Sequence, residues 1–257
     1  MVWLRPREGS DPRVAVSVGT SGWQYRHWRD AFYPAGLAAA DWLAFYAERF
    51  STVEVNASFY RLPKRETVQR WAATVPDGFA LTFKASRYVT HVRRLRDCAE
   101  PLERMRAIFE GAGTKLGPVL FQLPPTLRAD EPLLRAFLGS LPSAFRSAIE
   151  FRHPSWFTDG VLETLDANGA ALVHADRPGV RVSIPTLGGW SYLRFHQGRS
   201  DGPGYRRSKL AAYADAIAET RPRSVFAYFN NDTDGAAPRD ATTFAGLLAD
   251  RRVDVAA

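Results

Sequence analysis

The chain alternates short segments rich in β-branched and aromatic residues with longer segments whose apolar residues recur at helical spacing. Segments of the first kind predict buried strands, and segments of the second kind predict amphipathic helices. The strand pattern occurs at residues 14–18, 52–56, 79–85, 118–123, 147–152, 170–175, 191–195 and 224–229. The helical pattern occurs at 37–50, 64–75, 101–116, 131–141, 158–168, 208–220 and 241–251.

This alternation predicts an α/β fold in which parallel strands are joined by right-handed crossovers. Eight strand segments in 257 residues match a closed (β/α)₈ TIM barrel better than an open doubly wound sheet. No glycine-rich phosphate loop of the dinucleotide type follows a strand, which also disfavours the open sheet. Prolines and glycines between 176 and 191 predict an irregular connection or a short strand there. We expect one barrel domain at 14–251, a flexible tail at 1–13 and a C-terminal tail at 252–257.

Polar residues alternate with apolar ones along several predicted strands. In a closed barrel, residues two apart share a face, and functional sites form at the carboxyl ends of the strands. If Val53, Ile149, Val173 and Leu193 face the helices, a polar set faces the lumen. That set is Glu54, Asn56, Lys84, Gln122, Glu150, Arg152, His174, Asp176, Arg194, His196, Tyr228 and Asn230. A barrel lumen is normally filled by branched apolar residues, so the set indicates either a site or an internal ion-pair network.

Three interpretations of the polar set remain open. Its carboxylates can pair with its cations in a structural network, because buried charges must be paired. A divalent metal can be held by Glu54, Glu150, His174 and Asp176, since carboxylates and imidazoles suit such ions. The inward cations Lys84, Arg152 and Arg194 count against a metal, because they would neutralise the carboxylates. They favour an anionic ligand, such as a compound that carries a phosphate group. We therefore predict no cofactor, with a divalent metal not excluded.

Acid–base catalysis is the chemistry that this set suggests. Glu150, His196 and Asp176 are the candidate catalytic residues. The candidate substrate-binding residues include aromatic side chains on which sugars or nucleobases stack. They are Trp23, Glu54, Asn56, Tyr60, Lys84, Gln122, Arg152, His153, Trp156, His174, Arg194, Tyr228, Asn230 and Asp232.

The composition narrows the location and the partners. A net charge of +7 favours an anionic small molecule or nucleic acid as partner. The sequence contains no run of about 18 apolar residues, the length needed to cross a membrane. Residues 1–12 lack the apolar core of a signal peptide. We therefore expect a cytoplasmic protein. The single cysteine, Cys98, excludes an internal disulfide framework. The sequence leaves the oligomeric state open.

Several ordered motifs resemble the domain-of-unknown-function 72 family, the YecE-like proteins. The motifs are Gly19-Thr20-Ser21-Gly22-Trp23 with Phe32-Tyr33-Pro34, Thr52-Val53-Glu54-Val55-Asn56 with Ser58-Phe59-Tyr60, Gln122-Leu123-Pro124-Pro125, residues 150–157 (Glu-Phe-Arg-His-Pro-Ser-Trp-Phe) and Tyr228-Phe229-Asn230-Asn231-Asp232. The resemblance implies a TIM barrel and carries no settled activity. The chain departs from the family pattern at Asp30, where a glycine is usual, at the inserted Gln197, and at Asp240, where an asparagine is usual.

Overall fold

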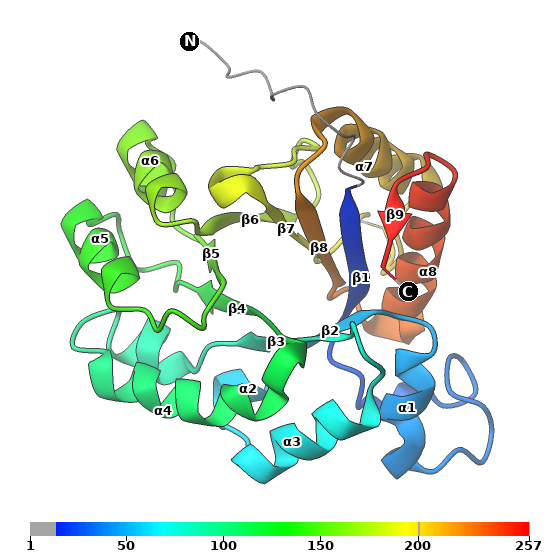
Figure 1. Cartoon of the computed structure of the whole chain (residues 1–257). Coiled ribbons are helices and arrows are strands. Elements are labelled where there is room, and N and C mark those ends of the chain that lie inside the picture. The colour runs from blue at the N-terminus through cyan, green and yellow to red at the C-terminus, as the bar shows by residue number, and fades with distance from the viewer. Residues whose placement is uncertain (1–13, 200, 257) are drawn as a thin grey trace, which may run out of the picture.

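A computed structural model describes residues 14–199 and 201–256, and in this part of the chain parallel strands close into a barrel (Figure 1). The strands are β1 (Ala15–Ser21), β2 (Thr52–Val55), β3 (Ala80–Lys84), β4 (Leu116–Gln122), β5 (Ser147–Glu150), β6 (Ala171–Asp176), β7 (Ser191–Phe195), β8 (Ser224–Phe229) and β9 (Asp254–Val255). Strands β2 to β8 are neighbours in chain order, and β1 lies between β8 and β2. This closure confirms the predicted TIM barrel.

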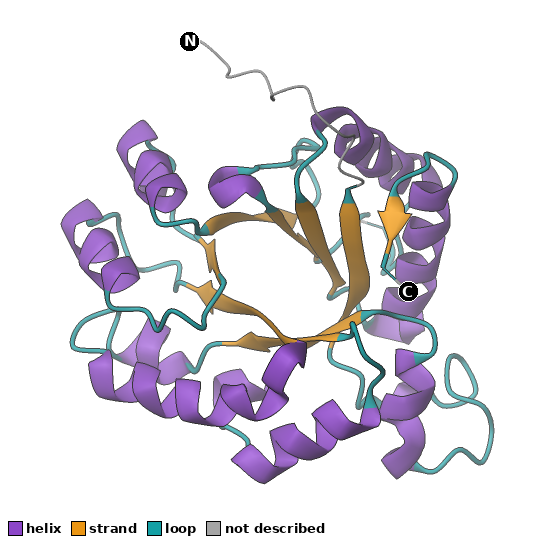
Figure 2. Cartoon of the chain, in the orientation of Figure 1, coloured by secondary structure: helices purple, strands orange, loops and turns teal. Residues whose placement is uncertain are grey.

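The helices lie outside the ring of strands (Figure 2). They are α1 (Trp42–Ala47), α2 (Ala57–Tyr60), α3 (Arg65–Thr74), α4 (Ala99–Phe109), α5 (Glu131–Gly139), α6 (Asp159–Ala167), α7 (Arg207–Thr220) and α8 (Ala236–Ala249). The connection from β6 to β7 holds only a short 3₁₀ turn at Leu187–Gly189, as its prolines and glycines predicted. The helix predicted at 101–116 ends at Phe109 and is followed by a 3₁₀ segment at Glu110–Lys115, in which Gly113 adopts a φ of +59°.

The main apolar core lies between the strands and the surrounding helices. Phe121 of β4 packs edge-on against Phe137 of α5, with ring centroids 5.3 Å apart. Helix α7 buries Leu210, Ala214 and Ile217, the spacing that places side chains on one face of a helix. Burial of these faces is what holds the helices on the barrel.

Toward the amino end of the barrel, the lumen is filled by a second apolar cluster. Its members are Leu120, Ala148, Ala171, Val173, Trp190, Tyr192 and Tyr228. At the amino end of the barrel the guanidinium of Arg146 lies 4.0 Å from the centroid of a Trp190 ring, a cation–π contact that covers this end of the cluster. The charged lumen residues are thereby confined to the carboxyl end.

Gly19 fixes how closely β1 approaches β2. A Cβ atom at this position would lie 2.0 Å from the carbonyl oxygen of Thr52 and 2.9 Å from the hydroxyl oxygen of Tyr46. Since no side chain fits that space, the glycine of this motif is explained by the strand contact.

The C-terminal prediction was wrong in one respect. Asp254–Val255 forms β9, which pairs in parallel with Ala15 and Val16 at the start of β1. The edge of β1 is free there because β2 pairs only with residues 19–21. The predicted tail at 1–13 lies outside the described residues. No helix in the described part of the chain is long and apolar enough to cross a membrane.

Candidate functional site

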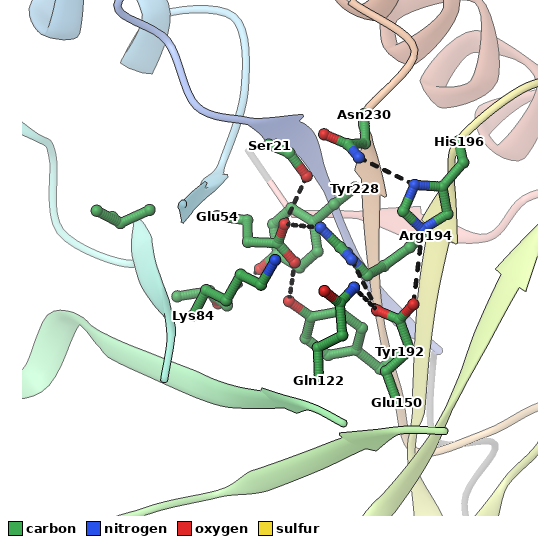
Figure 3. A network of polar contacts seen from close by, with 12 residues as sticks. Ser21, Glu54, Lys84, Gln122, Glu150, Tyr192, Arg194, His196, Tyr228 and Asn230 are labelled. Atoms are coloured by element: carbon green, nitrogen blue, oxygen red, sulfur yellow. Dashed lines mark hydrogen bonds and ion pairs between the residues drawn. The ribbon is translucent and has the colours of Figure 1, made fainter. Parts of the chain in front are cut away.

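The carboxyl end of the lumen is organised around one arginine. Arg194 of β7 donates from one terminal nitrogen to Glu150 Oε2 at 2.7 Å and from the other to Glu54 Oε1 at 2.8 Å (Figure 3). The side chain of Arg194 is 1% exposed, and both carboxylates are fully buried. Charge-assisted bonds of this length are among the strong hydrogen bonds of proteins. The fifth and seventh strands therefore place their charges together, as their alternation predicted.

Glu54 of β2 accepts hydrogen bonds from two donors besides Arg194. Its Oε1 accepts from the Ser21 hydroxyl, and its Oε2 accepts from the Tyr192 hydroxyl, each at 2.5 Å. Burial and the nearby Glu54 charge raise the pKa of Tyr192 far above its ordinary value, so the phenol stays protonated and donates. Both oxygens of the Glu54 carboxylate accept from protein donors, and we infer that it holds Arg194 in place.

One carboxylate oxygen of Glu150 in β5 faces the partly exposed side chains at the mouth of the barrel. Oε2 accepts from Gln122 Nε2 at 2.9 Å as well as from Arg194. Oε1 lies 2.5 Å from Arg152 Nε and 3.8 Å from His196 Nε2. Burial alone raises the pKa of the Glu150 carboxyl, but its charged and hydrogen-bonding neighbours, Arg194 foremost, outweigh burial and bring the pKa below its ordinary value. Glu150 is thus ionised at neutral pH, which suits a base rather than an acid.

His196 lies beside Glu150 at the top of β7. Its Nδ1 accepts from the Asn230 side-chain amide at 2.9 Å, an arrangement that leaves the ring proton on Nε2. The buried Nε2 atom has no hydrogen-bond partner among the described residues. Burial, followed by the charge of Arg194, lowers the pKa of His196 to about 3. The imidazole is neutral at physiological pH and can donate from Nε2 to a ligand.

Lys84 is the last residue of β3 and lies on the side of the network opposite His196 (Figure 3). Its Nζ lies 4.2 Å from the centroid of the Phe59 ring. Burial, followed by the charge of Arg194, lowers the pKa of Lys84, and the nearby carboxylates of Glu54 and Glu150 do not compensate. Lys84, Gln122, Arg152, His196 and Asn230 are only partly buried, so this rim is the part of the network that solvent reaches.

The predicted orientation of β6 was wrong. Val173 pairs with Tyr192 and packs in the lumen, so His174 and Asp176 face outward. There the Tyr213 hydroxyl of α7 donates to Asp176 Oδ1 and contacts His174 Nε2, each at 2.7 Å. Lys209 Nζ of α7 lies 2.9 Å from Asp176 Oδ1. These two residues attach α7 to the barrel, and neither is a catalytic candidate.

The aromatic candidates are mostly structural. Trp156 is fully buried and donates from Nε1 to the Leu127 carbonyl at 2.8 Å. Trp23 is 4% exposed and meets the Trp71 ring edge-on. The Tyr228 hydroxyl is enclosed in the lumen by the hydroxyls of Thr52 and Thr82. These three side chains are buried against the protein itself, so the packing of the barrel and its loops accounts for them.

The remaining candidates lie at the rim or in the loops. Tyr60 is 78% exposed and remains able to stack on a ligand. His153 accepts from the Ser155 backbone N–H at 3.1 Å and caps a 3₁₀ turn. Asp232 accepts from Trp28 Nε1 and pairs with His27, which joins the loops after β1 and β8. Asn56 directly follows β2, and its buried Oδ1 has no partner among the described residues.

Two members of the network escaped the sequence analysis, Ser21 and Tyr192. Tyr192 stands two residues before Arg194, so the alternation that placed Arg194 in the lumen placed Tyr192 there too. Ser21 was missed because the first strand was predicted to end at Val18, whereas β1 continues to Ser21. A run of Gly-Thr-Ser resembles a loop, and only its pairing with β2 and β8 makes it a strand.

The four residues considered as metal ligands, Glu54, Glu150, His174 and Asp176, are not arranged around a common point. Glu54 and Glu150 are held by guanidinium groups, and His174 and Asp176 point to α7. No group of three or more His, Cys, Asp or Glu side chains in the described part of the chain is arranged to hold a metal ion. A cavity of about 630 Å³ lies to one side, lined by residues of the loops after β2 and β3, α3 and α4, and holds none of the network residues.

These observations define a closed (β/α)₈ barrel with a buried Glu–Arg–Glu network at its carboxyl end. The chain belongs to the family described as "Protein of unknown function DUF72", whose model matches residues 17–257.

Relatives and solved structures agree with this membership. The UPF0759 protein YecE of Escherichia coli is 32% identical over 146 residues, which span 56% of this chain and about half (51%) of YecE. YunF of Bacillus subtilis is 26% identical over 91% of this chain and 94% of its own length. A DUF72 family protein of Thermotoga maritima superposes with a TM-score of 0.81 at 27% identity, covering 91% of this chain and 99% of that one. A DUF72 family protein of Enterococcus faecalis, at 19% identity and a TM-score of 0.74, covers 91% of this chain and 95% of that one and shares the fold.

Proposed function

We propose that this protein is an enzyme that binds an anionic substrate, phosphorylated or derived from nucleic acid, at the carboxyl end of the barrel and acts on it by acid–base chemistry. The observation that carries the proposal is the Glu150 carboxylate, which is fully buried, kept ionised, and directed by Oε1 toward the rim beside His196. Desolvated, charge-tuned carboxylates of this kind cluster at active sites.

The residues take different parts in this proposal. Glu150 accepts a proton from the substrate, and neutral His196 donates a hydrogen bond from Nε2. Arg152 and Gln122 hold the Glu150 carboxylate and border the place where a ligand would lie. Arg194 directs one N–H of each terminal nitrogen to a carboxylate, so its part in this proposal is to hold the two glutamates. Arg194 and Glu54 are positioning residues.

The charge of the barrel face supports an anionic substrate. The connections that leave the carboxyl ends of the strands are residues 22–41, 56–64, 85–98, 123–130, 151–158, 177–190, 196–206 and 230–235. They carry fourteen arginines and lysines against seven aspartates and no glutamate. This excess equals the net charge of the whole chain, +7. Such a field attracts anions to the mouth.

Replacement of Glu150 tests the proposal. Phosphorylated sugars and nucleotides are first screened for an increase in the melting temperature, which reports binding to the folded state. Turnover of the ligands found is then followed by mass spectrometry. Glu150→Gln keeps the shape and the Arg194 contact, and we expect it to lower turnover at least about 100-fold, the usual contribution of a general base. The matched control is Glu163→Gln, on the exposed face of α6. Equal turnover of the two variants would contradict the role of Glu150.

A second candidate is a nucleic-acid-binding protein without catalysis. Tyr60, Tyr88 and Phe157 are 78%, 44% and 57% exposed and lie in connections of the same basic face. Exposed rings among arginines favour stacking with unpaired bases. This function predicts affinity for single-stranded oligonucleotides that falls steeply with salt and persists in Glu150→Gln.

A further inference from the structure

Lys84 is set apart from the other lysines by its surroundings. Its side chain points into the carboxyl end of the lumen, toward Glu54 and Arg194 (Figure 3). Within residues 14–199 and 201–256, neither an ion pair nor a hydrogen bond involves its amine. In contrast, Lys115 donates to the carbonyls of Ala72 and Val75.

The charges of the network are balanced without Lys84. The carboxylates of Glu54 and Glu150 face the guanidinium groups of Arg194 and Arg152 at 2.5–2.8 Å. A protonated Lys84 would add an unmatched positive charge to a partly desolvated place, which costs free energy. The balance therefore favours the neutral amine, in agreement with the lowered pKa of Lys84. A neutral lysine amine beside other cations is nucleophilic.

We propose that Lys84 is a covalent nucleophile that forms an imine with an anionic aldehyde or ketone. This inference rests on the proposed function, because it assigns a chemical class, carbonyl compounds, to the substrate of the same site. The basic face attracts the anionic group of the substrate, and the carbonyl carbon lies over the amine of Lys84.

Imine formation needs no reagent other than the amine and the carbonyl compound. The Nζ lone pair attacks the carbonyl carbon as the C=O π bond breaks, and one proton passes from the attacking nitrogen to the oxygen, which gives a neutral carbinolamine. The remaining N–H proton leaves with the hydroxyl group as water while the nitrogen lone pair forms the C=N bond. Protonation of the imine nitrogen makes the carbon beside it more acidic. Glu150, across the network from Lys84, is the group that accepts a proton from that carbon.

Reductive trapping tests the imine directly. The protein is incubated with glyoxylate, pyruvate or dihydroxyacetone phosphate and sodium cyanoborohydride, and the labelled lysine is identified by peptide mass spectrometry. The chain has four lysines, Lys64, Lys84, Lys115 and Lys209, which serve as internal comparisons. We expect Lys84 to be labelled at least about tenfold faster than the exposed Lys64 at pH 7, since only the neutral amine attacks a carbonyl and the surroundings of Lys84 lower its pKa.

Variants complete the test. Lys84→Met and Lys84→Arg are expected to lose the rapid label, whereas Lys64→Arg keeps it. Labelling of Lys84 no faster than that of Lys64 with every probe would overturn the imine. Binding of glycerol 3-phosphate, which has no carbonyl group, is measured in parallel by calorimetry. If it binds while Lys84 stays unlabelled, the imine fails and the proposed anion site stands. If Lys84 is labelled at an unchanged rate in Glu150→Gln and this variant turns over the labelled carbonyl compound as fast as the wild type, the imine stands and the acid–base role of Glu150 fails.

Discussion

Arg194 is the residue on which the polar lumen depends. Burying two carboxylates costs several kcal/mol each unless a cation and hydrogen bonds compensate. One guanidinium meets both, while hydroxyls of Ser21 and Tyr192 complete Glu54. Burial lowers the pKa of Arg194, but the two glutamates outweigh burial and raise it above its ordinary value, so the charge is permanent. The network thus holds Glu150 ionised inside the barrel.

Removing the guanidinium tests this description. We expect Arg194→Met to lower the free energy of unfolding by about 3–5 kcal/mol at pH 7, the cost of leaving a buried charge without its partner. The measurement is urea unfolding. The control is Arg135→Met, whose exposed pair with Glu131 on α5 is worth about 0.5 kcal/mol or less. A loss as small as that of the control would show that Arg194 does not compensate the carboxylates.

The same variant has a predicted pH dependence. In the wild type, Glu150 has a lowered pKa, so the stability that it contributes is present above its ordinary pKa and is lost as the pH falls through the lowered value. In Arg194→Met, burial is no longer opposed by this cation and the pKa of Glu150 rises. The variant carboxyl then takes up its proton within the folded state. We therefore expect the difference in stability between the two proteins to be smaller at pH 4.5 than at pH 7.

Single strands differ in how clearly their sequences show which face lies inward. In β7, Tyr192 and Arg194 alternate with Leu193 and Phe195, and the polar face was assigned correctly. In β6, the lumen residues Ala171, Val173 and Ala175 alternate with Leu172, His174 and Asp176, so each face contains apolar residues. Parallel barrel strands are covered on both sides, and a one-residue error exchanges the faces. Only the contacts with α7 decide the orientation of β6.

The backbone conformation of the turn at Asp30 limits which residues can occupy that position. Asp30 has a φ of +62°, and its backbone N–H donates to the Tyr33 carbonyl. Glycine adopts this left-handed conformation without steric cost, and aspartate tolerates it better than most residues. The expectation of a glycine at this position, and the ability of aspartate to occupy it, both follow from this backbone conformation.

The assignment of His174 and Asp176 to the attachment of α7 gives a further prediction. We expect Tyr213→Phe to lower the free energy of unfolding by about 1–3 kcal/mol, because it leaves the buried Asp176 carboxylate with one donor fewer. Binding of anions at the barrel mouth should be unchanged. Urea unfolding and calorimetry with glycerol 3-phosphate measure the two effects. A loss of anion binding without a loss of stability would place β6 in the site after all.

At the scale of the whole molecule, the periodic sequence predicted the barrel because eight repeats of strand and helix leave few other topologies. It also placed Glu54, Glu150 and Arg194 together, since the carboxyl ends of barrel strands converge. It could not predict β9, because two residues carry no periodic signal and pair only where β2 leaves β1 uncovered. The burial of Trp23 and Trp156 depends on loop packing, which local sequence does not determine.

The concentration of positive charge at the carboxyl face, above a network whose charges are already balanced, makes the mouth the expected place for an anion. The most direct measurement is a crystal structure of the protein soaked in selenate, with the selenium anomalous signal locating the anion. The proposed site predicts a peak within hydrogen-bond distance of Arg152, Lys84 or His196. Peaks confined to other surfaces, such as the cavity between α3 and α4, would contradict an anion site at the barrel mouth.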